Sequence, residues 1–182
     1  MSVKARLIPS GSQTVGPFFR IGLQPLVDEA PACDADATDR ITIRGRVLDR
    51  DSAPVPDALL EFWSADRDGA ADQDGFAEGF QRTATDLDGN FSVTMRRPAP
   101  VALGDGAWQA PHLLVLVFAR GLMRHLISRV YFDGESANAS DVVLLGVPAA
   151  RRCTLTALRE AENSFCWDVI LQGEQETVFF AW

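Results

Sequence analysis

The sequence is poor in basic side chains, and lysine is almost absent. Its 182 residues include 17 lysines and arginines against 25 aspartates and glutamates, so the formal net charge at pH 7 is −8. Proteins that bind nucleic acid need clustered cations to contact phosphates, and an acidic excess opposes this. Lys4 is the single lysine, and arginine, which supplies the rest, suits carboxylates and ion pairs between subunits. The composition therefore argues against a nucleic-acid-binding protein.

Cysteine and long apolar segments are also scarce. Cys33, Cys153 and Cys166 are odd in number and form no CxxC pair, which argues against a zinc knuckle or a disulfide framework. The longest apolar run, residues 113–119, is far shorter than the roughly 20 residues of a membrane span. The first residues contain no apolar stretch of signal-peptide length. We therefore expect a cytoplasmic protein with reduced thiols.

Common catalytic and metal-binding motifs are missing as well. No glycine-rich phosphate loop follows a predicted strand, and no GxSxG nucleophile elbow is present. The acidic stretch from Asp66 to Asp74 has the spaced carboxylates that Ca²⁺ prefers, but Ala70 and Ala77 stand where an EF-hand loop needs oxygen donors. We interpret this stretch as a solvated, turn-rich loop without an assigned role. A serine hydrolase triad would need one of the two histidines, and no serine is placed to single one out.

Short runs of Val, Ile, Leu, Phe and Thr, separated by Gly, Pro and Asp, predict an all-β protein. The clearest run alternates, with Ile41, Ile43 and Val47 on one face, as in a half-buried strand. The predicted strands are residues 41–48, 58–65, 91–95, 112–119, 122–131, 153–158, 165–172 and 178–180. About eight such strands make an antiparallel β-sandwich, which we assign to residues 41–182 as one domain.

Two local features are predicted between these strands. Residues 86–90, with the sequence DLDGN, indicate a tight turn in which Gly89 adopts a positive φ angle. Residues 141–145 are compatible with a single helical turn, because Ser140 and Asp141 can each cap a helix. Both features are expected to be structural.

Residues 1–40 have a different character from the rest of the chain. They contain four prolines and an acidic stretch at residues 33–39, without sustained alternation. Such a segment reads as an extended N-terminal arm that either wraps a neighbour or stays disordered. Phe18, Phe19, Ile21 and Leu23 favour packing on a partner subunit, because apolar side chains in a free tail would be exposed to water.

Three ordered segments carry a likeness to a known family: residues 12–23, 110–132 and 172–180. Together they resemble the alpha-subunit type of the intradiol ring-cleaving dioxygenases, and the likeness spans nearly the whole chain. It implies a β-sandwich paired with a homologous beta subunit in a large alpha–beta hetero-oligomer. In that family, two tyrosines and two histidines of the beta subunit hold a non-haem Fe(III). The implied reaction uses O₂ to cleave 3,4-dihydroxybenzoate to 3-carboxy-cis,cis-muconate.

The sequence contains too few of these ligand types for an iron site of its own. It has one tyrosine, Tyr131, and two histidines, whereas the family's ferric site takes two phenolates and two imidazoles. By the resemblance, His112 takes the place of one ligand, while Leu114, Ala70 and Val101 fall at or near the other three. We therefore expect the partner beta subunit to bind the Fe(III), and we expect no metal ligand in this chain. His112 is then a hydrogen-bonded core residue.

The resemblance also implies which residues of this chain line the shared pocket: Thr14, Gly16, Pro17 and Arg120. Gly16 lacks a side chain and Pro17 has a fixed backbone angle, so the pair can place main chain close to a flat ring. Thr14 offers a hydroxyl beside it. Arg120 ends an apolar strand, and Gly121 directly after it marks a turn, so the guanidinium of Arg120 can bind or steer a carboxylate. By itself, an arginine at a strand end is most often a solvated charge, so this role depends on the resemblance.

Two other functions remain open at this point. The chain can be a non-catalytic β-sandwich that acts as a scaffold or binding module and is related to the dioxygenases only by descent. Retention of the set Thr14, Gly16, Pro17 and Arg120 argues against this, because a scaffold has no physical need for it. A self-sufficient metalloenzyme of one chain conflicts with the number of available ligands.

Overall fold

The structure is a computed structural model and describes residues 10–28, 39–64, 79–103 and 106–181. Within these ranges the chain forms helices and strands in the following order: α1 (Pro17–Asp28), β1 (Arg40–Leu48), β2 (Leu59–Ser64), β3 (Phe80–Ala84), β4 (Asn90–Arg96), β5 (Val101–Ala102), β6 (Trp108–Gln109), β7 (His112–Phe118), β8 (Leu126–Phe132), the 3₁₀ helix η1 (Ser136–Ala139), α2 (Val142–Gly146), the 3₁₀ helix η2 (Ala149–Leu155), β9 (Thr156–Ala161), β10 (Ser164–Cys166) and β11 (Val169–Ile170). The predicted β-rich class is confirmed.

Nine of these strands form one sheet in the order β11-β1-β10-β9-β8-β7-β2-β3, with β4 also paired to β1. The pairs β1–β4, β7–β8, β2–β7, β2–β3 and β9–β10 are antiparallel. The pairs β1–β10, β1–β11 and β8–β9 are parallel. The prediction of a purely antiparallel arrangement is therefore wrong, because the sheet is mixed. Strands β5 and β6 form a separate small sheet.

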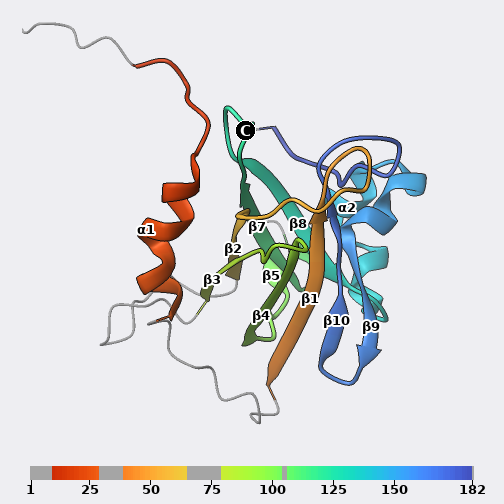
Figure 1. Cartoon of the computed structure of the whole chain (residues 1–182). Coiled ribbons are helices and arrows are strands. Elements are labelled where there is room, and N and C mark those ends of the chain that lie inside the picture. Colours follow the sequence, from red (N-terminus) through yellow and green to blue (C-terminus); the bar gives the residue numbers. More distant parts are fainter. Residues whose placement is uncertain (1–9, 29–38, 65–78, 104–105, 182) are drawn as a thin grey trace, which may run out of the picture.

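The sheet curves around a single main core. Alternate residues of its strands point inward, and one buried cluster combines Ile43 of β1, Phe62 of β2, Phe91 of β4, Val115 of β7 and Val130 of β8. The rings of Phe62 and Phe91 lie 6.0 Å apart between centroids, so β2 and β4 face each other across the core. Figure 1 shows the strands enclosing this core, with α1 beside the β2–β3 edge.

A second, smaller cluster lies beneath α2 and η2. It contains Ala110, Tyr131, Leu144, Val147 and Leu155, all of them buried. Helix α2 is capped by Asp141, whose side chain accepts hydrogen bonds from the backbone N–H groups of Val143 and Leu144. The predicted helical turn and its aspartate cap are thus confirmed. Burial of each such apolar side chain stabilises the fold by about 1.5–3 kcal/mol.

The strands differ from the prediction in five places. Strand β8 starts at Leu126, four residues later than expected, because the preceding residues form a turn. Strand β9 starts at Thr156, because the 3₁₀ helix Ala149–Leu155 occupies the predicted start. The run 165–172 is divided into β10 and β11, and residues 178–180 form no strand. Strand β3, Phe80–Ala84, was missed. The turn at 86–90 is confirmed, with Gly89 at φ +74°.

The extended arm predicted for residues 1–40 is wrong for residues 17–28, which form α1. Pro17 occupies the first helical position, where its missing N–H is harmless. Gly22 and Pro25 lie inside the helix and lower its intrinsic stability. A 12-residue helix of this composition is marginal by itself, so its order depends on tertiary contacts.

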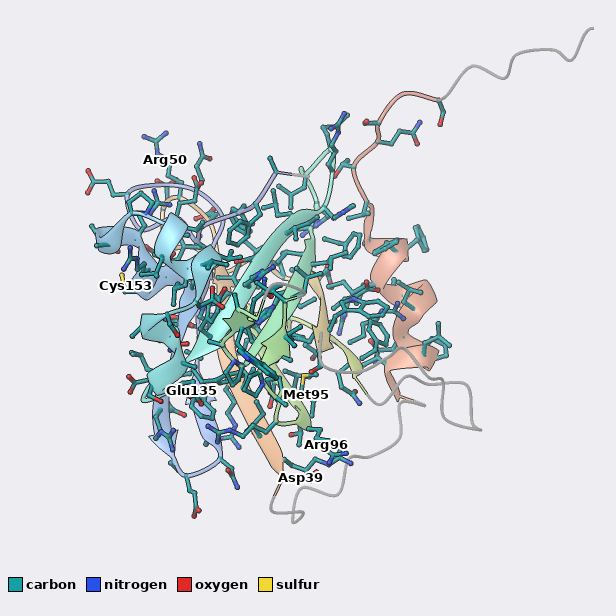
Figure 2. All side chains as sticks on the ribbon, turned by 180° about the vertical axis from the view of Figure 1, so that it is seen from behind. Asp39, Arg50, Met95, Arg96, Glu135 and Cys153 are labelled. Atoms are coloured by element: carbon teal, nitrogen blue, oxygen red, sulfur yellow. The ribbon has the colours of Figure 1, made fainter. Side chains whose placement is uncertain are left out.

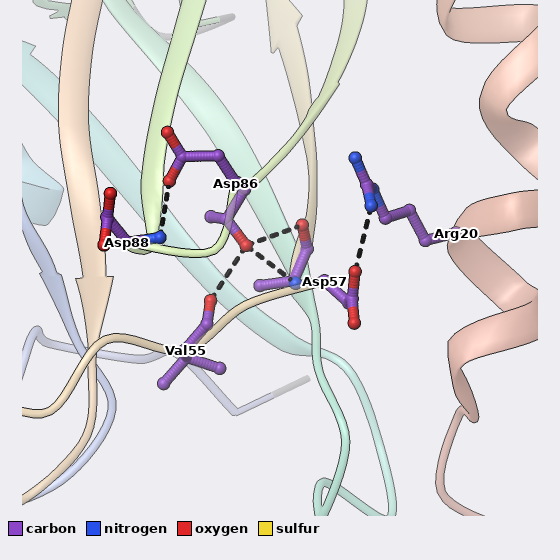
Figure 3. Close-up of polar contacts among 7 residues, drawn as sticks. Arg20, Val55, Asp57, Asp86 and Asp88 are labelled. Atoms are coloured by element: carbon purple, nitrogen blue, oxygen red, sulfur yellow. Dashed lines mark hydrogen bonds and ion pairs between the residues drawn. The ribbon is translucent and has the colours of Figure 1, made fainter.

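Two contacts join α1 to the sheet. The ring of Phe19 packs on that of Phe118 in β7, with centroids 5.4 Å apart. Arg20 donates from Nη1 to Oδ1 of Asp57 at 3.0 Å, in the loop before β2 (Figure 3). Thr85 holds this loop by donating its hydroxyl to the Val55 carbonyl at 2.8 Å and by accepting the Ala58 N–H at 2.9 Å.

Among the described residues, no helix is long and apolar enough to cross a membrane. The longest α-helix, α1, has 12 residues and contains a proline.

Gly45 in β1 offers a direct test of this packing. A Cβ built at Gly45 would lie 1.8 Å from the backbone oxygen of Trp167, so the backbone must move to admit one. We expect Gly45→Ala to lower the free energy of unfolding by about 3 kcal/mol, measured by urea denaturation. Gly146→Ala is the matched control, because a Cβ there meets no atom within 4 Å. Equal stability of the two variants would contradict this β1 packing.

Candidate functional site

The N-terminal segment before α1 lies on the turn between β7 and β8. The hydroxyl Oγ1 of Thr14 accepts a hydrogen bond from the backbone N–H of Gly121 at 2.7 Å. In the turn, the Leu122 N–H donates to the Ala119 carbonyl at 3.2 Å, and Gly121 has φ +90°. Glycine is the residue that adopts this backbone conformation without strain. The predicted turn after Arg120 is therefore confirmed.

Arg120 lies at the corner of this turn and is exposed. Its guanidinium forms no hydrogen bond or ion pair with other residues in the described part of the chain. Thr14 is hydrogen-bonded to Gly121, the residue that follows Arg120. An exposed guanidinium on a short turn is available to an anion from outside the chain.

Gly16 and Pro17 lie at the start of α1. The Gly16 carbonyl accepts the Phe19 N–H at 3.0 Å, which closes the first turn of the helix. A Cβ built at Gly16 meets no atom within 4 Å, and both residues are exposed. The two residues therefore present bare main chain at the surface. Both residues closely follow Thr14 in the sequence, and the side chain of Thr14 is hydrogen-bonded to the turn that contains Arg120 and Gly121.

A cavity of about 200 Å³ lies between parts of the N-terminal segment and the β7–β8 turn, and none of the four predicted site residues lines it. It is lined by Gln13, Val15, Phe118, Ala119, Leu122, Met123, Arg124 and His125. The rings of Phe118 and His125 lie 5.4 Å apart between centroids. Sequence reasoning missed this cavity, although Gln13, Val15 and His125 lie within the segments that carry the family likeness.

A buried polar network around Asp141 lies at the other end of the β7–β8 pair from this turn, where His112 pairs with Tyr131. The Asp141 carboxylate accepts hydrogen bonds from the Tyr131 hydroxyl at 3.1 Å and from the Ala110 N–H at 2.8 Å, and it also caps α2. His112 is buried, with Nδ1 2.8 Å from the Ala110 carbonyl and its ring stacked on Tyr131 at 5.5 Å. The prediction that His112 is a hydrogen-bonded core residue is confirmed.

The side chains around this network do not fit a ferric ion. Burial raises the pKa of Tyr131 to about 12, and its hydroxyl is already engaged as a hydrogen-bond donor to Asp141. Leu114 provides a hydrocarbon side chain in β7, and Val101 lies in the separate β5–β6 sheet. No group of three or more His, Cys, Asp or Glu side chains within the described ranges could hold a metal. Ala70, the acidic stretch 66–74 and Cys33 lie outside the described residues.

Two further cavities among the described residues lie elsewhere on the molecule. One of about 570 Å³ lies over β1, β4 and β10, where Arg46 pairs with Asp168 at 3.6 Å. Another of about 380 Å³ lies beside Arg50. Figure 2 shows Arg50 and the exposed Cys153 on the side of the molecule away from α1. Neither cavity includes any of the four predicted site residues.

The mainly β fold agrees with a comparison of the sequence with known families. Residues 20–173 match the family model for dioxygenases. The chain therefore belongs to this dioxygenase family, as the resemblance predicted.

The individual relatives are named as subunits of one enzyme. The chain is 41% identical to the protocatechuate 3,4-dioxygenase alpha chain of Burkholderia cepacia, with 93% of this chain and 95% of the relative covered. It is 36% identical to the alpha chain from Pseudomonas putida, with 93% and 94% covered. The beta chain from Burkholderia cepacia is 27% identical, with 76% of this chain and 67% of the relative covered.

Solved structures show the same fold. The dioxygenase domain of a carbohydrate-binding fusion protein from Streptomyces sp. SirexAA-E superposes with a TM-score of 0.56 at 30% identity, with 78% of this chain and 84% of that chain covered. Catechol 1,2-dioxygenase from Acinetobacter radioresistens gives a TM-score of 0.60 at 16% identity, with 84% and 58% covered. The second likeness concerns the fold alone.

The state of Tyr131 can be measured cleanly, because the sequence contains no other tyrosine. In the folded chain, we expect its absorbance titration to show a midpoint near pH 12 rather than near 10. The pKa is raised in the folded state, so this group's stabilisation is complete below pH 10 and is lost as pH rises towards 12, by about 2–3 kcal/mol in total. A midpoint at pH 10 in the folded chain would show that the phenol is not buried.

Proposed function

We propose that this chain is the iron-free alpha subunit of a protocatechuate 3,4-dioxygenase. In this proposal a homologous beta subunit binds a non-haem Fe(III), and this chain completes the pocket in which 3,4-dihydroxybenzoate reacts with O₂ to give 3-carboxy-cis,cis-muconate. The proposal rests on a contrast between two sets of residues in this chain, one exposed and one buried. Thr14 is bonded to the turn that carries Arg120 and is exposed, as are Gly16, Pro17 and Arg120, whereas His112 and Tyr131 are buried and hydrogen-bonded within the chain.

The chemistry of the rim suits a carboxylated aromatic ring. The bare main chain at Gly16 and Pro17 can approach the flat face of a ring closely, because no side chain of Gly16 intervenes. The exposed guanidinium of Arg120 complements the substrate carboxylate, and a charge-assisted pair with a carboxylate is among the stronger polar contacts. This chain thus contributes substrate binding and orientation, while the ring-cleavage chemistry depends on the partner's metal.

Helix α1 supports the proposal that the N-terminal arm packs on the partner subunit. Its inner face is occupied by the Phe19–Phe118 contact, whereas Phe18 and Ile21, one helical turn apart, are 81% and 58% exposed. Two large exposed apolar side chains next to each other on one short helix form a surface that water disfavours and that a subunit interface would bury. The proposed assembly is a hetero-oligomer of alpha and beta chains.

Oxygen uptake with 3,4-dihydroxybenzoate tests the proposal directly. We expect no uptake with this chain alone and uptake with the complex of this chain and its homologous beta partner. In the complex, Arg120→Ala is expected to raise KM by about tenfold or more and to lower kcat by less, because a charged contact to the substrate is lost in the ground and transition states alike. Arg44→Ala, which removes another exposed arginine outside the site, is the matched control.

Two results would contradict this proposal. If the beta partner alone is as fast as the complex, this chain is a scaffold and the pocket roles are lost. If Arg120→Ala leaves KM unchanged in an active complex, Arg120 does not bind the substrate.

The interface role of α1 has its own test. We expect Phe18→Ser to weaken assembly with the beta subunit by about tenfold or more in Kd, because a large exposed apolar side chain no longer contributes buried area. Leu87→Ser is the matched control, because Leu87 is exposed to a similar degree, 84% against 81%, but lies in the turn between β3 and β4. Sedimentation velocity of the mixed subunits measures both. Equal weakening by the two substitutions would contradict a specific interface at α1.

A further inference from the structure

The hydroxyl of Thr14 is already engaged within this chain. Its Oγ1 accepts the Gly121 N–H at 2.7 Å, which is a short hydrogen bond for an N–H donor. Its own proton is directed towards the Val15 carbonyl at 3.4 Å, a much weaker contact. The strong interaction of Thr14 therefore runs to the β7–β8 turn. It joins two segments that are 107 residues apart in the sequence.

The turn itself explains why this hydrogen bond matters. The Leu122 N–H to Ala119 carbonyl bond closes a four-residue turn, in which Gly121 has φ +90° and Arg120 has a negative φ. These angles define a type II turn with Arg120 and Gly121 at its two central positions. The Gly121 N–H takes no part in the closing bond, so it needs another acceptor or water. Thr14 supplies that acceptor and so fixes the orientation of the Arg120–Gly121 peptide.

We infer that Thr14 is a positioning residue that acts through Arg120, by clamping the N-terminal segment to the turn that carries the guanidinium. This inference rests on the proposed function, because the two elements that the clamp joins are the two sides of the proposed pocket. One side is the main chain at Gly16 and Pro17, and the other is Arg120. With the clamp in place, both sides hold a fixed geometry before the substrate arrives, and less order has to be gained on binding.

A double-mutant cycle in the alpha–beta complex tests this inference. Thr14→Val removes the hydroxyl and keeps the branched shape at an exposed position, so the fold is not at risk. We expect it to raise KM for 3,4-dihydroxybenzoate about fivefold, the equivalent of one hydrogen bond, with a smaller change in kcat. Thr14→Ser keeps the hydroxyl and is expected to restore KM to within about twofold of the wild-type value. In the Arg120→Ala background, Thr14→Val is expected to have no further effect on KM.

The outcomes separate positioning from direct contact. If the effects of Thr14→Val and Arg120→Ala on KM simply multiply, Thr14 acts on the substrate independently of Arg120 and the inference is wrong. It is equally wrong if Thr14→Val leaves KM unchanged, or if Thr14→Ser is as defective as Thr14→Val.

Amide exchange of Gly121 distinguishes failure of this inference from failure of the proposed function. In the complex, we expect Thr14→Val to speed hydrogen–deuterium exchange at the Gly121 amide by about tenfold, and Thr14→Ser to leave it near the wild-type rate. Unchanged exchange in Thr14→Val would show that the clamp does not exist, whatever the catalytic result. If exchange rises as expected but this chain contributes nothing to oxygen uptake, the clamp exists, the proposed function fails, and the positioning role fails with it.

Discussion

The buried carboxylate of Asp141 is the constraint on which much of this structure depends. It is fully buried and accepts four hydrogen bonds, from the backbone N–H groups of Ala110, Val143 and Leu144 and from the hydroxyl of Tyr131. A carboxylate without such donors could not stay in the interior, because burial of an unpaired polar group costs several kcal/mol. The four donors come from the segment before β7, from β8 and from α2. A single side chain therefore fixes the relative positions of three elements.

This network also determines where the chain can take part in chemistry. Tyr131 is held as a neutral hydrogen-bond donor to Asp141, and its raised pKa follows mainly from burial. His112 is stacked on that phenol and bonded to main chain, so neither ring is directed towards an open ligand position. The buried cluster beneath α2 and η2 therefore stabilises the fold. In the proposed function, the substrate contacts the rim at Thr14 and Arg120, which offers backbone groups, one hydroxyl and one cation.

The features that the sequence predicted well are those set by local patterns. The alternation of Ile41, Ile43 and Val47 predicted β1, and Asp141 predicted the cap of α2, because both signals lie within a few residues of the element. Helix α1 was missed because Gly22 and Pro25 favour a non-helical segment. In the folded chain, contacts of Phe19 and Arg20 with residues distant in the sequence outweigh that tendency. The parallel pairs of β1 were missed because register between distant strands leaves no local signal.

The candidate site also combines a feature that the local sequence predicts with features that it does not predict. The turn after Arg120 was predicted from Gly121 alone, and its positive φ angle bears this out. The four site residues themselves were predicted from the family resemblance. The presence of a threonine, a glycine, a proline and an arginine does not by itself indicate a binding site. The acceptor for the Gly121 N–H could not be predicted, since Thr14 is 107 residues away. Only the folded chain shows that two of the motifs touch.

The N-terminal segment is held at both ends by different kinds of contact. Upstream, Thr14 is bonded to the Gly121 N–H. Downstream, Phe19 packs on Phe118 and Arg20 pairs with Asp57. The residues between these anchors are Val15, Gly16, Pro17 and Phe18, so the bare main chain lies in the one stretch that is fixed on both sides. Because α1 is too short and too poor in helix formers to be stable by itself, the downstream anchors order the helix and the pocket wall together. Contacts on the outer face of α1 would therefore also stabilise the wall at Gly16 and Pro17, which couples subunit assembly to the geometry of the site.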